Sequence, residues 1–243
     1  MLIDFILLFL FAGVPYYIFF EKTNTLGKEK IFILSALLVI AGMVVSYVFP
    51  QETSMPFILV ALAASLFSLY KANKTTNLYK LTYYILFFNA PMLIMFEAKD
   101  SLLYGISLLL SLSGVYLMGK YYERSYGSAN YRSVSGITLV TPYAGLILTA
   151  YFTTLALYPP FPNALLFLNG ILNSEINLMW YLTVVVIFFG NFLIAVRVMA
   201  KTVFGKPNPN VHYIDVKPRE RFLHLFIFII LLFLSAIGIG ELL

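Results

Sequence analysis

The stretch Phe222 to Leu242, FLHLFIFIILLFLSAIGIGEL, decides the fold, because it is too apolar to be stable in water. A hydrocarbon core about 30 Å thick needs roughly 20 apolar residues in helical form. This run is long enough, and its one carboxylate, Glu241, lies near its end. It has none of the in-and-out alternation of a lipid-facing strand. The run is therefore predicted to be a transmembrane helix.

The rest of the chain repeats this pattern. Hydrophobic residues make up 61% of the 243 residues and charged residues only 11%, and the mean hydropathy is +0.89. No soluble domain of this length hides so much apolar surface in one core. The sequence predicts an all-α fold, a polytopic transmembrane bundle with eight spanning helices and one short or broken helix. The expected spans are Leu2 to Phe20, Ile31 to Phe49, Pro56 to Tyr70, Leu81 to Phe96, Ser101 to Gly119, Gly136 to Tyr158, Met179 to Ala200 and Phe222 to Leu242.

Two of the apolar runs need separate comment. The first is expected to remain as a span and not to be cleaved, because Asp4 stands where a signal peptide has basic residues. The ninth run, Asn163 to Leu172, is too short to cross unaided and is expected to be a half-helix or a re-entrant segment. Kinks are expected at Pro15, Pro91 and Pro142, since proline removes a backbone donor.

The basic residues predict the orientation. If residues 163–172 do not cross, all of the 16 Lys and Arg except Lys99 fall on one side. Basic loops stay cytoplasmic, which would place both termini on the outer face. The net charge of +5 is explained by this topology and by anionic lipid headgroups, so no nucleic-acid partner is expected.

The chain lacks the residues that several kinds of metal, haem and phosphate site require. It has no cysteine, so disulfides and thiolate-bound metal clusters are excluded. Its two histidines, His212 and His224, are not placed to hold a haem between helices, and no phosphate-binding glycine motif is present. We expect no catalytic residues, no metal and no cofactor.

Polar residues within or beside the spans are the remaining candidates for an ion path, because such residues are costly in lipid. Glu97, Lys99 and Asp100 share one turn near a span end, where they could pair with one another, and Glu175 also lies near a span end. Carboxylates there are more often interfacial anchors than relays. Asn89 and Asn191 lie deeper and are neutral, as groups that hold helices together usually are.

The second half of the chain resembles the antiporter-like membrane subunits of complex I, membrane-bound hydrogenases and Mrp-type antiporters. Gly136 and Pro142 are similar to a "Gly-Leu … Pro" motif, and Leu155 to Phe161, with Pro159 and Pro160, to a "Leu-Ala-x-x-Gly-x-Pro-Pro" motif whose Gly is altered here. Asp215, Arg219 and Glu220 match "Asp-x-x-x-Arg-Glu" before the last span. A weaker likeness covers Tyr83 to Leu117, so that about half of the chain is involved.

This chain departs from the family where the family carries protons. The glutamate of the family falls near Leu109, and its Lys or Glu after the Pro-Pro turn falls near Phe167; both are apolar here. The resemblance therefore implies a degenerate, mainly structural or arm-extending subunit of a proton-translocating respiratory or hydrogenase complex. Its partners would be other membrane subunits and lipids, in the cytoplasmic membrane of a prokaryote. By itself the chain would have no enzymatic activity.

The sequence suggests an N-terminal five-helix half (1–120), a cytoplasmic loop (121–135) and a C-terminal antiporter-like half (136–243). Two other functions remain open. A stand-alone small transporter or proton/cation antiporter is favoured by the short run 163–172 and the neutral span centres. A lipid-modifying enzyme would need clustered interfacial acids, and the chain offers only Glu97 with Asp100.

Overall fold

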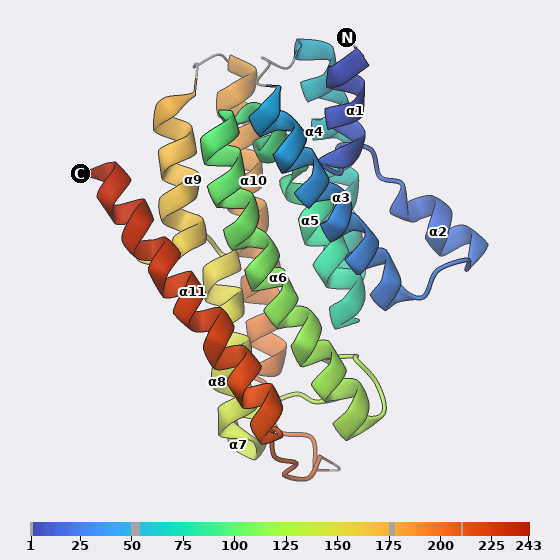
Figure 1. Cartoon of the computed structure of the whole chain (residues 1–243). Helices are drawn as coiled ribbons and strands as arrows, with labels where there is room; N and C mark the ends of the chain where they lie inside the picture. Colours follow the sequence, from blue (N-terminus) through green and yellow to red (C-terminus); the bar gives the residue numbers. More distant parts are fainter. Residues whose placement is uncertain (1, 50–53, 175–177, 210) are drawn as a thin grey trace.

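The ordered elements of the chain are helices (Figure 1). The structure is a computed structural model that describes residues 2–49, 54–174, 178–209 and 211–243. Within these residues there is no strand, apart from an isolated bridge between Asn77 and Asn130, so the predicted all-α class is confirmed. The helices are α1 (Leu2–Leu10), α2 (Tyr17–Thr23), α3 (Lys28–Val48), α4 (Met55–Lys74), α5 (Leu78–Met95), α6 (Ala98–Tyr126), α7 (Ile137–Val140), α8 (Pro142–Leu155), α9 (Pro162–Asn173), α10 (Leu178–Thr202) and α11 (Pro218–Leu242).

Within the described ranges, six helices are long and apolar enough to cross a bilayer: α3, α4, α5, α6, α10 and α11. Their outer faces are apolar as well; on α11, for example, Leu232 is 68% exposed and Phe233 is 67% exposed. A surface of this kind is suited to lipid. The chain is thus an integral membrane protein, but the expected eight continuous spanning helices are not confirmed.

The expected span Leu2 to Phe20 is wrong as a continuous helix. Helix α1 ends at Leu10, and α2 begins only at Tyr17. Between them Ala12 has a φ of 60°, in the left-handed region, and Pro15 has no N–H to donate to a helical bond. The break therefore has a local cause, which the mainly apolar character of residues 11–16 does not reveal.

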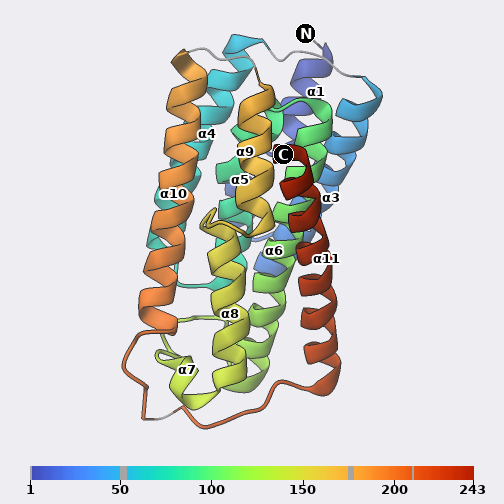
Figure 2. The ribbon, with the colours of Figure 1, turned by 90° about the vertical axis from the view of Figure 1, so that its left-hand side faces the viewer.

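The expected span Gly136 to Tyr158 is also wrong as one helix. Helix α8 starts at Pro142 and ends at Leu155, after which Leu157 has a φ of 57° and Pro159 and Pro160 cannot donate. Helix α9 then begins at Pro162, and Figure 2 shows it continuing along the bundle from the end of α8. The short run at 163–172 is thus the second half of a broken helix.

Prolines have different effects at different positions. Pro142 is at the start of α8, where its missing donor is not needed, whereas α5 continues as a helix through Pro91.

Helix α6 runs on to Tyr126, past residue 121, where the cytoplasmic loop was expected to start. Tyr121 and Tyr122 pack into the core, which explains the longer helix.

Helix α5 lies at the centre of one part of the bundle, in contact with α3, α4, α6 and α10. Large side chains such as Phe87 and Phe88 on it are fully buried. Because lipid offers no hydrophobic drive for helices to associate, small residues that allow close packing matter. Gly190 on α10 packs against the Phe88 ring, and Gly114 on α6 packs against the Tyr151 ring of α8.

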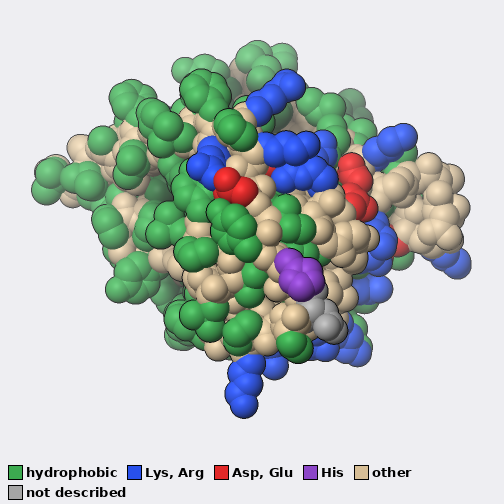
Figure 3. Space-filling view, turned by 90° about the horizontal axis from the view of Figure 1, so that it is seen from below, with side chains coloured by type: hydrophobic (Ala, Val, Ile, Leu, Met, Phe, Trp, Pro, Cys, Tyr) green, Lys and Arg blue, Asp and Glu red, His purple; other side chains and the backbone are tan. Residues whose placement is uncertain are grey.

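The two ends of the bundle differ in charge. Helices α3, α5, α8 and α11 begin at one end, and α4, α6 and α10 finish there (Figures 1 and 2). We call it the basic end, because every Lys and Arg except Lys99 lies in or beside these helix ends. Figure 3 looks onto it and shows Lys and Arg side chains spread across the surface. The predicted one-sided distribution of basic residues is thus present in the fold.

We expect Gly114→Ala to lower the free energy of unfolding by about 1–3 kcal/mol, the usual cost of forcing volume into a packed interior. The added Cβ would overlap the Tyr151 ring. That ring cannot easily move, because its hydroxyl is 2.9 Å from His224 Nδ1 and it stacks on Phe228. Thermal denaturation in one detergent measures the change. The control is Gly240→Ala, where a Cβ meets nothing within 4 Å; an equal melting temperature for both variants would contradict the expectation.

Candidate functional site

A buried polar contact joins Asn89 of α5 to Asn191 of α10. Each amide donates to the other: Asn89 Nδ2 lies 3.1 Å from Asn191 Oδ1, and Asn191 Nδ2 lies 2.8 Å from Asn89 Oδ1. Asn89 also donates to Ile85 O at 2.8 Å and accepts from the Tyr104 hydroxyl of α6 at 2.8 Å. Both asparagines and Tyr104 are buried. Two of the predicted candidates therefore bind each other and link three helices.

An aromatic cluster lies directly beside this amide pair. The ring of Tyr104 is 5.8 Å from that of Phe167 on α9 and 5.6 Å from that of Phe96, centroid to centroid. Phe167 is 2% exposed and Leu109 is 8% exposed. The resemblance led us to look for titratable side chains at these two positions. Both are instead occupied by buried apolar side chains.

A row of polar residues follows the contact between α6, α9 and α11; of its members only Asp100 was among the candidates predicted from the sequence. At its middle, Ser107 donates to Asn163 Oδ1 at the start of α9. Further along α9, Asn169 Nδ2 lies 3.2 Å from Gly238 O of α11, and Asn173 Nδ2 lies 2.9 Å from Asp100 Oδ2 of α6. The available signal was the spacing of the three asparagines within a short apolar run.

Asn163 is the incompletely satisfied member of this row. Its side chain is fully buried, and within the described part of the chain Nδ2 has no hydrogen-bond partner. Such a donor is costly and calls for a polar group beside it. It lies just after the break between α8 and α9, because α9 begins one residue earlier at Pro162.

The row continues toward the basic end with the only histidine inside the described helices. His224 of α11 is 1% exposed, and its Nδ1 lies 2.9 Å from the Tyr151 hydroxyl of α8. His224 lies near the start of the expected last span, and no role was predicted for it from the sequence. We define the polar row by its members: Asp100, Ser107, Ser111, Tyr151, Asn163, Asn169, Asn173 and His224.

The charged candidates near the start of α6 do not pair with one another. Lys99 Nζ lies 2.7 Å from Glu241 Oε1 at the end of α11. Asp100 is buried and bound by Asn173, whereas Glu97 is exposed. Glu175 lies outside the described residues. Asp100 and Glu241 therefore tie helix ends together, as interfacial anchors do.

At the basic end, the residues of the terminal motif form ion pairs. Glu220 pairs with Arg124 of α6, and Asp215 pairs with Arg221. Arg219 is exposed. Gly136, with a φ of 66°, approaches Gly205 and Pro207 so closely that a side chain would not fit. These contacts dock the segment before α11 onto the ends of α6 and α7.

Two charged groups at the basic end have structural roles that the sequence did not reveal. Arg197 of α10 donates to Thr75 O at 3.0 Å and to Ala72 O at 2.6 Å, and so satisfies carbonyls at the end of α4. Glu21 of α2 accepts from the hydroxyls of Tyr83 and Tyr84, each at 2.6 Å. Partners so distant in sequence leave no local signal.

Among the described residues, no group of three or more His, Asp or Glu side chains is placed to hold a metal ion. The chain matches no model of a known protein family, and no curated protein is similar to it at a significant level. The arrangement of polar groups thus has to be interpreted on its own chemistry. It offers amide and hydroxyl contacts at the centre of the bundle and charges at its ends.

We expect Asn89→Leu and Asn191→Leu each to lower the free energy of unfolding by about 1–3 kcal/mol, because each leaves a buried amide without its partner. The double variant should lose clearly less than the sum of the two. A double-mutant cycle by thermal or chemical denaturation measures the coupling. Tyr104→Phe is the matched control, since it removes one donor and keeps the reciprocal pair. Strictly additive losses would contradict an energetic coupling between the amides.

Proposed function

We propose that the chain is a degenerate antiporter-like membrane subunit of a proton-translocating respiratory or hydrogenase complex, in which it is structural and does not itself carry protons. The observation that carries the proposal is the chemistry at the bundle centre. There, Asn89 and Asn191 satisfy each other, and Leu109 and Phe167 are packed apolar residues. Proton transfer needs titratable groups at short intervals, with water between them.

The broken helix α8–α9 supports the same proposal. The break falls at Pro159 and Pro160, within the part of the sequence that resembles the family motif. Broken backbone is tolerated at membrane depth where it is buried in protein or lines a water-filled cavity. Here α9 packs against α6 and α11, and residues such as Leu155 and Leu166 are buried.

We propose a topology of eight crossings, in which α1 with α2 and α8 with α9 each make one interrupted crossing. The six continuous helices would supply the others. With this count the basic end lies on one side, and Lys99 lies on the other. The positive-inside rule then assigns the basic end to the cytoplasm of a prokaryotic cell and both termini to the outer face.

A second candidate function is a stand-alone transporter or proton/cation antiporter, and the polar row favours it. The row contains two ionisable side chains far apart along the bundle, Asp100 and His224, and the unpaired amide of Asn163 lies between them. Intramembrane ionisable residues are by default functional candidates. The polar row is therefore the part of the bundle to which we assign this second function.

The first function predicts that Glu97→Gln, Asp100→Asn and Glu175→Gln each leave the number of protons moved per turnover unchanged. The complex would be extracted gently, identified by mass spectrometry and assayed in vesicles. Deleting the chain should instead reduce assembly of the complex, seen on native gels. A single neutralisation that stops pumping in a fully assembled complex would refute a purely structural role.

The two functions also differ for the purified chain in liposomes. Under the first, proton flux should equal that of empty vesicles, because the centre carries no relay. Under the second, flux should be measurable with a pH-sensitive dye, and His224→Phe should abolish it. Lys206→Gln is the matched control, because Lys206 is exposed at the basic end and lies outside the polar row. Flux that survives His224→Phe would reject the polar row as the path.

A further inference from the structure

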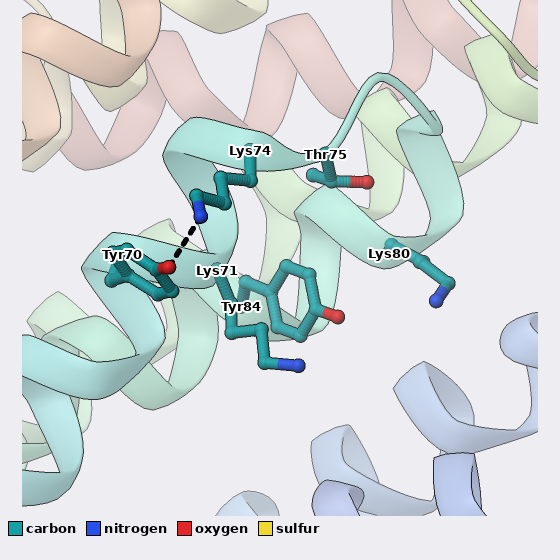
Figure 4. A pocket seen from close by; sticks show the side chains of 6 residues that line it. All are labelled: Tyr70, Lys71, Lys74, Thr75, Lys80 and Tyr84. Atoms are coloured by element: carbon teal, nitrogen blue, oxygen red, sulfur yellow. Dashed lines mark hydrogen bonds between the residues drawn. The ribbon is translucent and has the colours of Figure 1, made fainter.

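A pocket of about 350 Å³ opens at the basic end, where α4 ends and α5 begins (Figure 4). It is lined by Tyr70, Lys71, Lys74, Thr75, Lys80 and Tyr84. Three of these six residues are lysines, and none is acidic. The lysines come from both sides of a helix–turn–helix corner and line one pocket. An arrangement of this kind attracts an anion.

One carboxylate lies beside the pocket, and its charge is already matched. Lys80 Nζ is 3.1 Å from Glu21 Oε1. Burial raises the pKa of Glu21, but hydrogen bonds from Tyr83 and Tyr84 and the ammonium of Lys80 outweigh it and lower the pKa below its ordinary value. Glu21 is thus ionised near neutral pH. Three ammonium groups less one carboxylate leave two net positive charges at the pocket.

The lysines of α4 are not needed by their own helix. Cations near a helix end usually serve its last carbonyl groups. Here Arg197 does so, through its bonds to Ala72 O and Thr75 O. Lys71 lies over the ring of Phe67 at 5.6 Å, and Lys74 lies over the ring of Tyr70 at 4.2 Å and donates to its hydroxyl. Both remain able to contact a ligand.

The surface leading to the pocket is apolar. Val60, Phe67 and Tyr70 lie on α4 at helical spacing and are 49%, 40% and 53% exposed. Because α4 is one of the six candidate spanning helices, this stripe faces lipid and ends at the lysines. A ligand with an anionic head and a hydrocarbon tail would contact both surfaces, whereas a soluble anion would contact only the lysines.

We propose that this pocket binds the phosphate group of an anionic phospholipid, whose acyl chain lies along the exposed stripe of α4. The headgroup phosphate, which carries one negative charge, accepts hydrogen bonds from Lys71, Lys74 and Lys80, and the net positive charge of the pocket is more than enough to neutralise it. The lipid thereby fixes the α4–α5 corner at the membrane surface. This proposal is independent of whether the chain belongs to a larger complex.

The test is lipid binding to the purified full-length protein in detergent, followed by native mass spectrometry. Phosphatidylglycerol should bind more tightly than phosphatidylcholine, whose headgroup has no net charge. The variant K71Q/K74Q/K80Q should bind phosphatidylglycerol roughly 150-fold more weakly, as expected for the loss of three ammonium groups beside a headgroup. K201Q/K206Q/K217Q is the matched control, since these lysines are exposed at the same end but outside the pocket.

Each other outcome counts against the proposal. Equal losses in both triple variants would mean general attraction to the basic end, without a specific pocket. Displacement of the lipid by millimolar inorganic phosphate would identify a soluble phosphate as the ligand. If the triple variant melts at a lower temperature than the wild type, the single variant Lys71→Gln decides, because Lys71 contacts the Phe67 ring and forms no ion pair with Glu21. An unchanged affinity in that variant would overturn the proposal.

Discussion

The bilayer interior offers no hydrogen-bond partners, and this constraint explains most of the structure. Every backbone and side-chain polar group at that depth has to find its partner within the protein. The long helices satisfy their own backbones. Where helices end or carry amides, other helices supply the partner: Arg197 satisfies carbonyls at the end of α4, and Asn191 satisfies Asn89. Polar contacts therefore fix which helices are neighbours, while apolar packing fixes how close they lie.

The same constraint limits where the chain can be broken. A broken helix has carbonyl and N–H groups without helical partners, so it is stable only when shielded. The break between α8 and α9 is followed by Asn163, which is held by Ser107 of α6, and the neighbouring Leu155 and Leu166 are buried. The break between α1 and α2 is covered in a similar way, because Phe11, Ala12 and Tyr17 are all buried. Both breaks thus belong to the packed interior.

The helical class and the apolar character followed from the sequence because they depend on composition and run length, and the one-sided basic residues followed from their positions between the apolar runs. The continuity of Leu2–Phe20 and Gly136–Tyr158 did not, since apolar composition does not distinguish a whole helix from two halves. Asn89 and Asn191 were identified by their depth, but their pairing joins positions 102 residues apart and has no local signature. Glu21, Arg197 and the asparagines of α9 were missed because their partners come from other helices.

The reciprocal amide pair bears on whether anything moves through the bundle centre. Asn89 and Asn191 use both donor and acceptor on each other, and Tyr104 occupies a further lone pair. A water file through this point would have to replace these bonds, and the adjacent rings of Phe96 and Phe167 give water no polar partner. The polar row differs, because Asn163 Nδ2 has no hydrogen-bond partner among the described residues. The α5–α10 contact therefore holds its helices together through polar groups that are already paired, whereas the contact between α6, α9 and α11 retains one amide donor for a further polar group.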